Sequence, residues 1–224
     1  MDNLLRRIDS EIERSSLLKH RFYLLWSEGK LDLGQLKGYA LEYFQLVKAV
    51  PLLVRNVMSC CTNDTNLKYV LSKNYREESE HIDLWMKFAV SMGINKDELV
   101  DYVSADATNN IVNFLLALTK RSVGQGAAVM YAYEKQLPEI SRSKVNGLKE
   151  FYNLGHIQEA TEYFLVHEEV DLRHAAVWKS VIERGSHNPS GSESLYQAAV
   201  DSLWAQNRLL DSVCERYLSP LVGS

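Results

Sequence analysis

The chain contains few of the residues that cross-link or interrupt a fold. Its 224 residues include 3 cysteines, 4 prolines and 11 glycines. Cys60 and Cys61 are adjacent and Cys214 is distant, so they form neither a disulfide framework nor the Cys-x-x-Cys pattern of a zinc site. Because so few cysteines are typical of a reducing compartment, we predict a cytoplasmic protein.

An excess of one charge and long apolar runs are also missing. The formal net charge is -4, so no basic field indicates binding to nucleic acid or to an anionic membrane. The N-terminal segment is charged throughout, unlike a signal peptide, and no apolar run reaches the ~18 residues of a membrane span. We therefore expect neither a nucleic-acid partner nor a membrane partner.

What the sequence does contain is apolar residues that recur every three or four positions, which is typical of helices. No segment alternates as a strand would. We predict about seven helices with short connections in a single all-α, bundle-like domain over residues 1–224. The expected helices cover approximately 2–28, 33–61, 66–92, 106–120, 126–148, 157–184 and 193–218, with a short one beginning near Asn95.

Several residues predict where these helices end or bend. Gly29 and Gly93 are placed to end two of them, and Asp32 is a candidate N-cap for the helix that follows it. Pro51 and Pro138 lie inside expected helices and should bend them.

The remaining interruptions are small or polar residues. Gly124 and Gly126 should interrupt or loosen the chain after the helix near 106–120. Residues 186–192, SHNPSGS, are predicted to form a loop.

The segment FLVHEEVDLRHAAVW carries His167, Asp171 and His174. A helix turns by about 100° per residue, so Asp171 lies about 40° from His167 on one side and His174 about 20° on the other. All three therefore project from one face of an apolar helix. A buried carboxylate between two imidazoles costs several kcal/mol unless a cation compensates it, so the triplet predicts a metal site.

A second candidate is the Glu-x-x-His motif of Glu78 and His81, which also share one helical face. Di-metal bundles use this motif together with carboxylates from other helices. The alternative is that Glu77, Glu78 and Glu80 form a solvated acidic face.

A third candidate is Glu134, which follows a run of apolar and small residues and should point inward. It could instead be a surface residue paired with Lys135 or Lys120. Together the candidates supply carboxylates and imidazoles but no cysteine, a set that suits non-heme iron or manganese better than structural zinc. Two metal ions sharing six protein ligands would keep open positions for O2.

Five segments resemble the heme-oxygenase-like di-metal oxidases, and in particular their CADD-type branch, named after a chlamydial protein associating with death domains. They are FYLLWSEGKL, YALEYF, HIDLW, YAYEKQLPEI and FLVHEEVDLRHA, and the resemblance covers nearly the whole chain. It implies a seven-helix bundle like that of TenA thiaminases and PqqC, usually as a homodimer. It also implies an Fe/Fe or Mn/Fe centre that uses O2 and an external reductant.

The resemblance further implies a function and its residues. CADD-type proteins make para-aminobenzoate for folate synthesis by sacrificing a tyrosine of their own, with a lysine as amine donor. The sacrificed tyrosine falls on Tyr23 and the amine donor on Lys144. The ligand positions fall on His81, Glu134, His167, Asp171 and His174, and Tyr39, Tyr43, Tyr131 and Tyr133 fall in aromatic stretches around them.

One departure concerns the remaining glutamate, because the branch has a longer spacing between this ligand and His81. Alignment favours Glu78 and leaves Glu77 as the alternative; both face His81 on a helix. Without the resemblance, Tyr23 would be taken for a core residue and Lys144 for a solvated one.

Other functions compete with this one. The same centre could oxidise an external amino acid or fatty acid. A TenA-type thiaminase would need a nucleophilic cysteine that residues 126–140 lack, and a PqqC-like cofactor-independent oxidase would not need the full set of carboxylates. A non-enzymatic death-domain-type binding protein is the alternative of a different class, and no motif of the sequence supports it.

Overall fold

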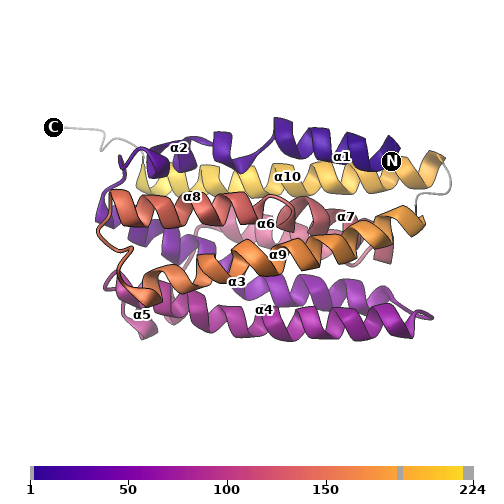
Figure 1. Ribbon diagram of the computed structural model, residues 1–224, viewed down its shortest axis with the longest axis horizontal. Helices are drawn as coiled ribbons and strands as arrows, with labels where there is room; N and C mark the ends of the chain where they lie inside the picture. Colours follow the sequence, from indigo (N-terminus) through magenta and orange to yellow (C-terminus); the bar gives the residue numbers. More distant parts are fainter. Residues whose placement is uncertain (1–2, 186–188, 219–224) are drawn as a thin grey trace.

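Long helices lie side by side in the computed structural model, which describes residues 3–185 and 189–218 (Figure 1). No strand occurs among these residues, so the all-α prediction is confirmed. The elements in chain order are α1 (Asn3–Arg14), the 3-10 helix η1 (Leu17–Lys19), α2 (Arg21–Ser27), α3 (Leu33–Cys60), α4 (Thr65–Ser91), α5 (Lys96–Asp101), α6 (Asp106–Leu118), α7 (Val123–Glu134), α8 (Leu137–Glu150), α9 (Gln158–Gly185) and α10 (Pro189–Tyr217).

Local side-chain chemistry sets several helix ends as expected. Asp32 caps α3 and Asn95 caps α5, each through a capping box. Gly29 and Gly93 have φ values of 65° and 81°, a left-handed conformation that costs glycine least. The predicted ends at these residues are confirmed.

The prediction of one helix over 2–28 is wrong, because this stretch is divided into α1, η1 and α2. Two side chains compete with a continuous helix. The Ser16 hydroxyl accepts a hydrogen bond from the Leu18 amide, and the His20 imidazole accepts one from the Phe22 amide. Each side chain therefore caps a new helical start.

The expected helix over 126–148 is also divided, into α7 and α8. Pro138 lies in the first turn of α8, where its missing N–H leaves no hydrogen bond unmade, so it begins a helix instead of bending one. Gly124 and Gly126 lie inside α7 and do not interrupt it. A Cβ on Gly126 would lie 2.5 Å from Val57, so this glycine lets α7 approach α3 closely.

The remaining predicted interruptions have mixed outcomes. α3 continues as a helix through Pro51, and the bend there stays a prediction. Of the loop predicted over 186–192, residues 186–188 lie outside the described residues. The rest of that prediction is wrong, because α10 begins at Pro189. With two expected helices divided, the chain has more separate helices than the seven predicted.

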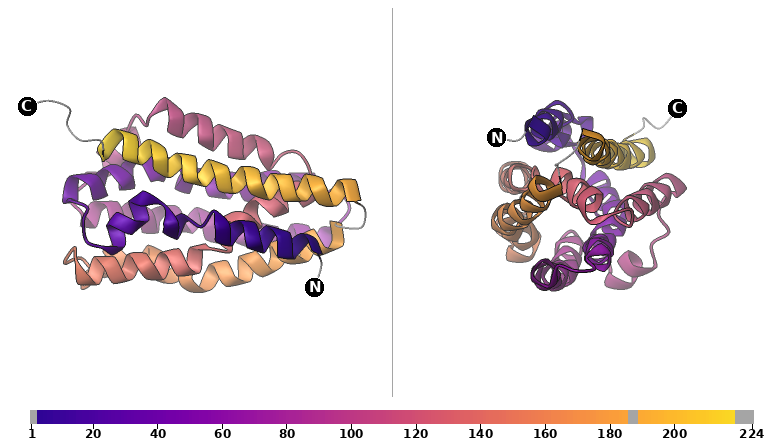
Figure 2. Two further views of the ribbon diagram at one scale, coloured as in Figure 1. Left: turned by 90° about the horizontal axis from the view of Figure 1, so that it is seen from above. Right: turned by 90° about the vertical axis from the view of Figure 1, so that its right-hand side faces the viewer.

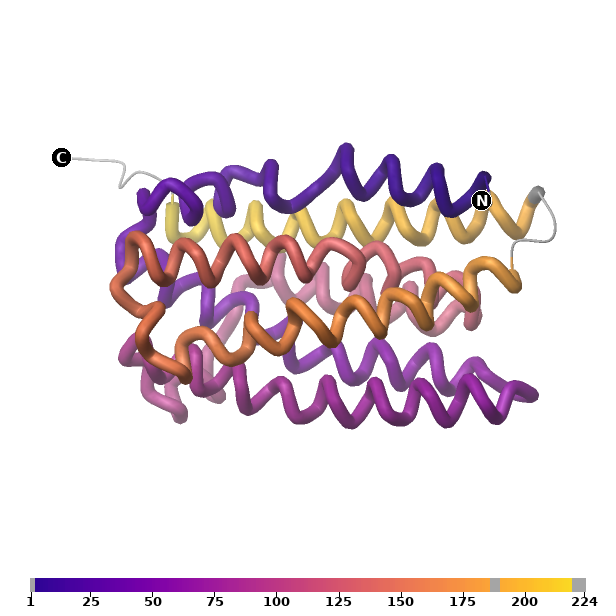
Figure 3. The backbone as a smooth tube through the Cα atoms, in the orientation of Figure 1, coloured from indigo at the N-terminus to yellow at the C-terminus, as the bar shows by residue number. Residues whose placement is uncertain are grey.

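α7 lies at the centre of the bundle and α9 at its side (Figure 2). α9 packs against α4, α7 and α8, while α4 also packs against α3, and α7 against α10 (Figure 2). α4 and α9 run in opposite directions along the long axis (Figure 3). Residues early in α9 therefore face residues late in α4. Within the described residues, no helix has the length and apolarity that crossing a membrane requires.

Candidate metal centre

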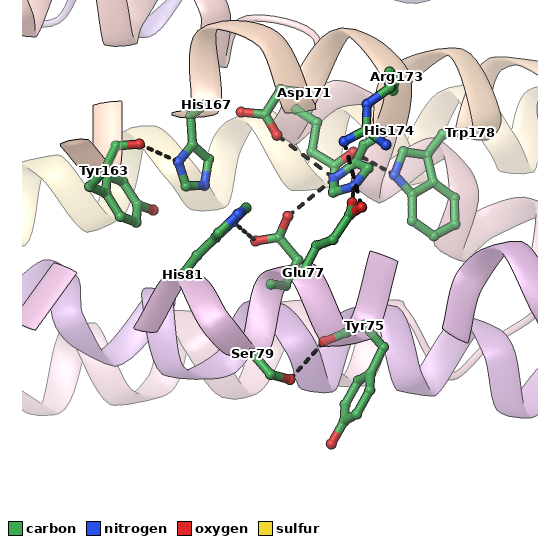
Figure 4. Close-up of polar contacts among 12 residues, drawn as sticks. Tyr75, Glu77, Ser79, His81, Tyr163, His167, Asp171, Arg173, His174 and Trp178 are labelled. Atoms are coloured by element: carbon green, nitrogen blue, oxygen red, sulfur yellow. Dashed lines mark hydrogen bonds and ion pairs between the residues drawn. The ribbon is translucent and has the colours of Figure 1, made fainter. Parts of the chain in front are cut away.

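The predicted triplet lies on the face of α9 that is turned toward α4. His167, Asp171 and His174 are all buried, and Asp171 is only 1% exposed (Figure 4). Intervals of four and three residues place these three side chains on one face, although Val166 and Val170 stand directly before His167 and Asp171 in the sequence. The close-up shows His81 and Glu77 of α4 opposite these three side chains.

Two other helices complete the cluster. α4 contributes Glu78 and His81, and α7 contributes Glu134, its last residue. The candidate ligand atoms form two overlapping groups, in each of which all atoms lie within 4.8 Å of one another. One group is Glu78, His81 and His167; the other is Glu78, Glu134, Asp171 and His174. The structure thus brings together all six residues named as ligands, and Glu78 belongs to both groups.

Glu77 and Glu78, which the sequence separated poorly, differ in the structure. The Glu78 side chain is 5% exposed, whereas that of Glu77 is 34% exposed. Glu77 belongs to neither ligand group and instead contacts His174 from the outside, with 2.7 Å between its Oε2 and the Nε2 of His174. The geometry therefore favours Glu78 as the ligand.

Two residues that the sequence reasoning missed orient candidate ligands. His167 Nδ1 donates to the backbone carbonyl of Tyr163 over 2.6 Å, which turns Nε2 toward the cluster. Trp178 Nε1 donates to Glu134 Oε2 over 2.6 Å and leaves Oε1 without a partner. Helical spacing could have found both, since Tyr163 lies four residues before His167 and Trp178 four residues after His174.

The polar atoms of the cluster lack partners in a way that suits metal ions. Glu78 Oε1, Glu134 Oε1 and both carboxylate oxygens of Asp171 are buried without a hydrogen-bond partner among the described residues. Buried polar atoms are rarely left unpaired, so a ligand is the ordinary explanation. The oxygen and imidazole donors fit iron or manganese.

Electrostatics supports the same interpretation. Burial and the nearby Glu78 charge raise the pKa of Asp171, and burial with the charges of Asp171 and Glu78 raises the pKa of Glu134, both well above their usual values. A divalent cation would remove this repulsion. Burial also lowers the pKa of His167 to about 4, so its imidazole is neutral near pH 7, as metal binding requires.

Tyr23 and Lys144 meet in a separate aromatic pocket. Lys144 is 4% exposed, so the alternative of a solvated lysine is wrong. Its Nζ donates a hydrogen bond to the Tyr39 hydroxyl and lies 4.8 Å from the centre of the Tyr23 ring. The Tyr39 and Tyr23 hydroxyl oxygens are 3.3 Å apart.

The Lys144 amine has an apolar environment. Aromatic rings surround it, and no carboxylate among residues 3–185 and 189–218 forms an ion pair with it. Burial therefore lowers its pKa well below the usual lysine value. A neutral amine keeps the lone pair that a nucleophile needs.

Aromatic rings in contact connect this pocket with the metal-ligand cluster. The Tyr163 ring stacks on His167 at 4.1 Å and meets Trp85 at 4.8 Å. Trp85 in turn lies 5.7 Å from Tyr39, all between ring centres. The packing leaves the two regions joined through side chains of α3, α4 and α9.

The other tyrosines named from the sequence divide between two places. Tyr43 stacks on Trp85 with ring centres 5.3 Å apart. Tyr133 is buried, and its burial, followed by Tyr43, Tyr163 and the carboxylates of the cluster, raises its pKa well above the usual value. Tyr131 lies elsewhere, because its hydroxyl donates to Asp9 of α1.

Comparison with protein families gives one match over most of the chain. The sequence model of a family described as iron-containing redox enzymes matches residues 37–207. That stretch includes every candidate metal ligand and Lys144, while Tyr23 precedes it.

Individual relatives extend the likeness to nearly the full length. The chain is 33% identical to a 4-aminobenzoate synthase of Chlamydia pneumoniae over 91% of this chain and 93% of the relative. It is 34% identical to the 4-aminobenzoate synthase of Chlamydia trachomatis over 81% of this chain and 80% of the relative. A solved TenA homologue of Pseudomonas syringae covers 95% of this chain and 93% of its own, with a TM-score of 0.82 and 14% identity, and supports the predicted heme-oxygenase-like fold.

Proposed function

Since this chain belongs to the family of iron-containing redox enzymes, we propose that it is an O2-dependent para-aminobenzoate synthase that consumes its own Tyr23. The relatives named 4-aminobenzoate synthase, whose product is the same compound, support the product. The observation that carries the self-sacrificing part is the buried contact of the Lys144 amine, the Tyr39 hydroxyl and the Tyr23 hydroxyl.

The six-residue cluster would hold two metal ions, Fe/Fe or Mn/Fe. His81 and His167 would bind one ion, Glu134, Asp171 and His174 the other, and Glu78 would bind both, because it alone belongs to the two ligand groups. When bound and reduced by an external donor, the metal pair supplies the activation of O2.

The pocket explains how one side chain could supply the product ring. In para-aminobenzoate, the carboxyl carbon and the amine occupy the two ring positions that carry Cβ and the hydroxyl in tyrosine. Release therefore requires cleavage of the Cα–Cβ bond of Tyr23, oxidation of Cβ by O2, and replacement of the phenolic oxygen by nitrogen. The Tyr23 hydroxyl contacts the Tyr39 hydroxyl that accepts the Lys144 hydrogen bond, so Tyr39 links the oxygen to be replaced with the amine.

The residues around the reacting groups hold protons and exclude water. Burial and the nearby Tyr43 raise the pKa of the Tyr23 hydroxyl well above its usual value, so the phenol keeps its proton at rest. Burial favours the uncharged form of the Lys144 amine. Nitrogen donation would break its Cε–Nζ bond; with O2 as the oxidant, Cε would become an aldehyde and the phenolic oxygen of Tyr23 would leave as water. A closed pocket protects such oxidative chemistry from side reactions with water.

The test is product release without any added substrate. Protein is loaded anaerobically with Fe²⁺ or with Fe²⁺ and Mn²⁺ and is then given O2 and a reductant. It should release para-aminobenzoate, up to about one equivalent per chain, because each chain has one Tyr23 to consume. Tyr23→Phe should release none. Tyr131→Phe is the matched control, since its hydroxyl contacts Asp9 outside the pocket, and it should release as much as the unaltered protein.

The competing functions give other results. Product that forms only after an external amino acid or fatty acid is added would contradict the self-sacrificing proposal and favour an oxidase on the same centre. Protein that binds no metal would contradict both. The homodimer and the cytoplasmic location stay predictions, and sedimentation and cell fractionation test them directly.

A further inference from the structure

His174 lies between two glutamates of α4 and contacts each through a different ring nitrogen. Its Nε2 is 2.7 Å from Glu77 Oε2, and its Nδ1 is 3.1 Å from Glu78 Oε1 (Figure 4). Nδ1 is buried and makes no hydrogen bond with that oxygen, whereas Nε2 forms a hydrogen bond with Glu77. The two nitrogens are therefore in different situations.

The contact with Glu77 decides which nitrogen can serve a metal ion. A carboxylate only accepts hydrogen bonds, so Nε2 must carry the proton that is donated to Glu77. In the neutral ring this leaves the lone pair on Nδ1, which faces Glu78 and lies 4.0 Å from Asp171. His167 has the opposite arrangement, because its Nδ1 is used by the Tyr163 carbonyl.

Glu77 is itself held in place. The Nη2 atom of Arg173, the residue before His174, lies 3.5 Å from Oε1, the second carboxylate oxygen of Glu77. The Glu77 side chain is 34% exposed and that of Arg173 62% exposed, so this pair lies at the rim of the cluster. One oxygen of Glu77 thus contacts the arginine and the other fixes the imidazole.

We propose that Glu77 is a positioning residue that fixes the tautomer and ring orientation of His174, so that this histidine binds metal through Nδ1 while His167 binds through Nε2. The inference rests on the proposed dinuclear centre and adds to it a residue that acts on one of the two ions. We expect its effect to fall on the ion held by Glu134, Asp171 and His174, because the side chain of Glu77 contacts His174 and Arg173.

The experiment is metal titration of the purified full-length chain. Unaltered protein, Glu77→Ala, Glu77→Gln and the control Glu80→Ala are titrated anaerobically with Mn²⁺, and bound metal is counted after gel filtration. Glu80 is an exposed acidic residue of α4 close to Glu77 in sequence, so its removal matches the loss of charge without the contact to His174. Loss of such an outer hydrogen-bond partner costs about 10–100-fold in affinity.

We expect Glu77→Ala to weaken one of the two Mn²⁺ sites by about 10–100-fold and to leave the other unchanged. Glu77→Gln should weaken it less, because its side-chain oxygen can still accept the Nε2 proton. Glu80→Ala should match the unaltered protein. Circular dichroism of each variant separates a local effect from misfolding, and Glu77→Gln, which preserves the shape of the side chain, serves if Glu77→Ala does not fold.

Several outcomes would overturn the inference. Equal binding of two ions by Glu77→Ala and the unaltered protein would exclude the positioning role, and equal weakening of both sites would exclude its confinement to one ion. A structure of the Mn²⁺-loaded protein with His174 bound through Nε2, or with Glu77 itself as a ligand, would do the same. These results differ from failure of the proposed function, in which the unaltered protein would bind no metal pair.

Discussion

The cluster of six candidate metal ligands and the Lys144 pocket both bury groups that are normally charged, and they do so in opposite ways. The cluster gathers three carboxylates and leaves four of their oxygens unpaired. The pocket encloses one amine with aromatic rings and gives it a phenol as a partner. The cluster therefore has negative charge that cations can compensate, whereas the pocket has almost none.

The two regions suit different chemistry because of this difference in charge. A buried charge is stabilised by a counter-charge or is lost through protonation or deprotonation. Metal ions can supply the counter-charge for the carboxylates, so the cluster suits binding. The amine has no counter-charge, so burial lowers its pKa and favours the neutral form, and the pocket suits nucleophilic chemistry. The two regions should accordingly respond differently to substitution.

The largest effect should come from Asp171→Asn, which removes a carboxylate from the cluster. Metal affinity should fall by more than the roughly 100-fold that the loss of an outer partner can cost, and product release should stop. The metal-free variant should nevertheless be more stable than the metal-free unaltered protein at pH 7. The raised pKa of Asp171 means that folding there takes up a proton, and asparagine removes that requirement.

Thermal unfolding with and without Mn²⁺ tests both expectations, the weaker metal binding and the higher stability of the metal-free variant. The stability gain of the metal-free variant should shrink as the pH falls toward about 4, where the unfolded Asp171 also becomes protonated. A metal-free Asp171→Asn protein that is less stable at every pH would contradict the charge interpretation of the cluster.

Lys144→Met should abolish product release but leave both metal ions bound. Methionine fills a similar volume without an amine, so the fold should gain about 1–3 kcal/mol from no longer burying a polar group. Lys149→Met, on the exposed face of the same helix, is the control. Loss of metal from Lys144→Met would show that the two regions are not separate.

A smaller effect is expected from Tyr39→Phe, which removes the hydroxyl between Lys144 and Tyr23 but keeps the ring packing. Product release should slow by about tenfold, in proportion to one lost hydrogen bond of roughly 1.4 kcal/mol, with metal content unchanged. Single-turnover rates measure this. An unchanged rate would mean that the amine reaches the Tyr23 ring without this bridge.

The smallest effect is the pH dependence that Lys144 gives to the metal-free protein. The pKa of Lys144 is lowered in the folded state, so folding releases a proton and is penalised below the unfolded value near 10.4. The stability difference between Lys144→Met and the unaltered protein should therefore shrink as the pH rises toward 10, to the part that comes from burying the neutral amine. A constant difference between pH 7 and 10 would contradict a neutral Lys144.

Much of the cluster could be predicted because its chemistry follows helical spacing. His167, Asp171 and His174 share a face through a simple angular argument, and Gly29 and Asp32 mark boundaries that backbone chemistry dictates. Spacing along one helix, by contrast, could not separate Glu77 from Glu78. Their exposures differ because α9 packs against one flank of α4 and buries Glu78 but not Glu77.

The remaining errors also arose where tertiary contacts or competing caps decide. Ser16 and His20 cap new helices inside a stretch whose apolar repeat continues. A proline such as Pro138 is compatible either with a bend within a helix or with the start of one, and the sequence does not distinguish the two. The burial of Lys144 could not be seen in its charged local sequence. It depends on rings from other helices, such as Tyr39 and Phe164, which only the fold brings near it.

The most direct test of the central claim is the intact mass of the chain before and after a single exposure of the metal-loaded protein to O2 and reductant. We expect a loss of mass that peptide mapping places at Tyr23, together with a change at Lys144 and an equivalent amount of para-aminobenzoate. An unchanged chain mass accompanied by product would show that the ring comes from elsewhere and would contradict the account.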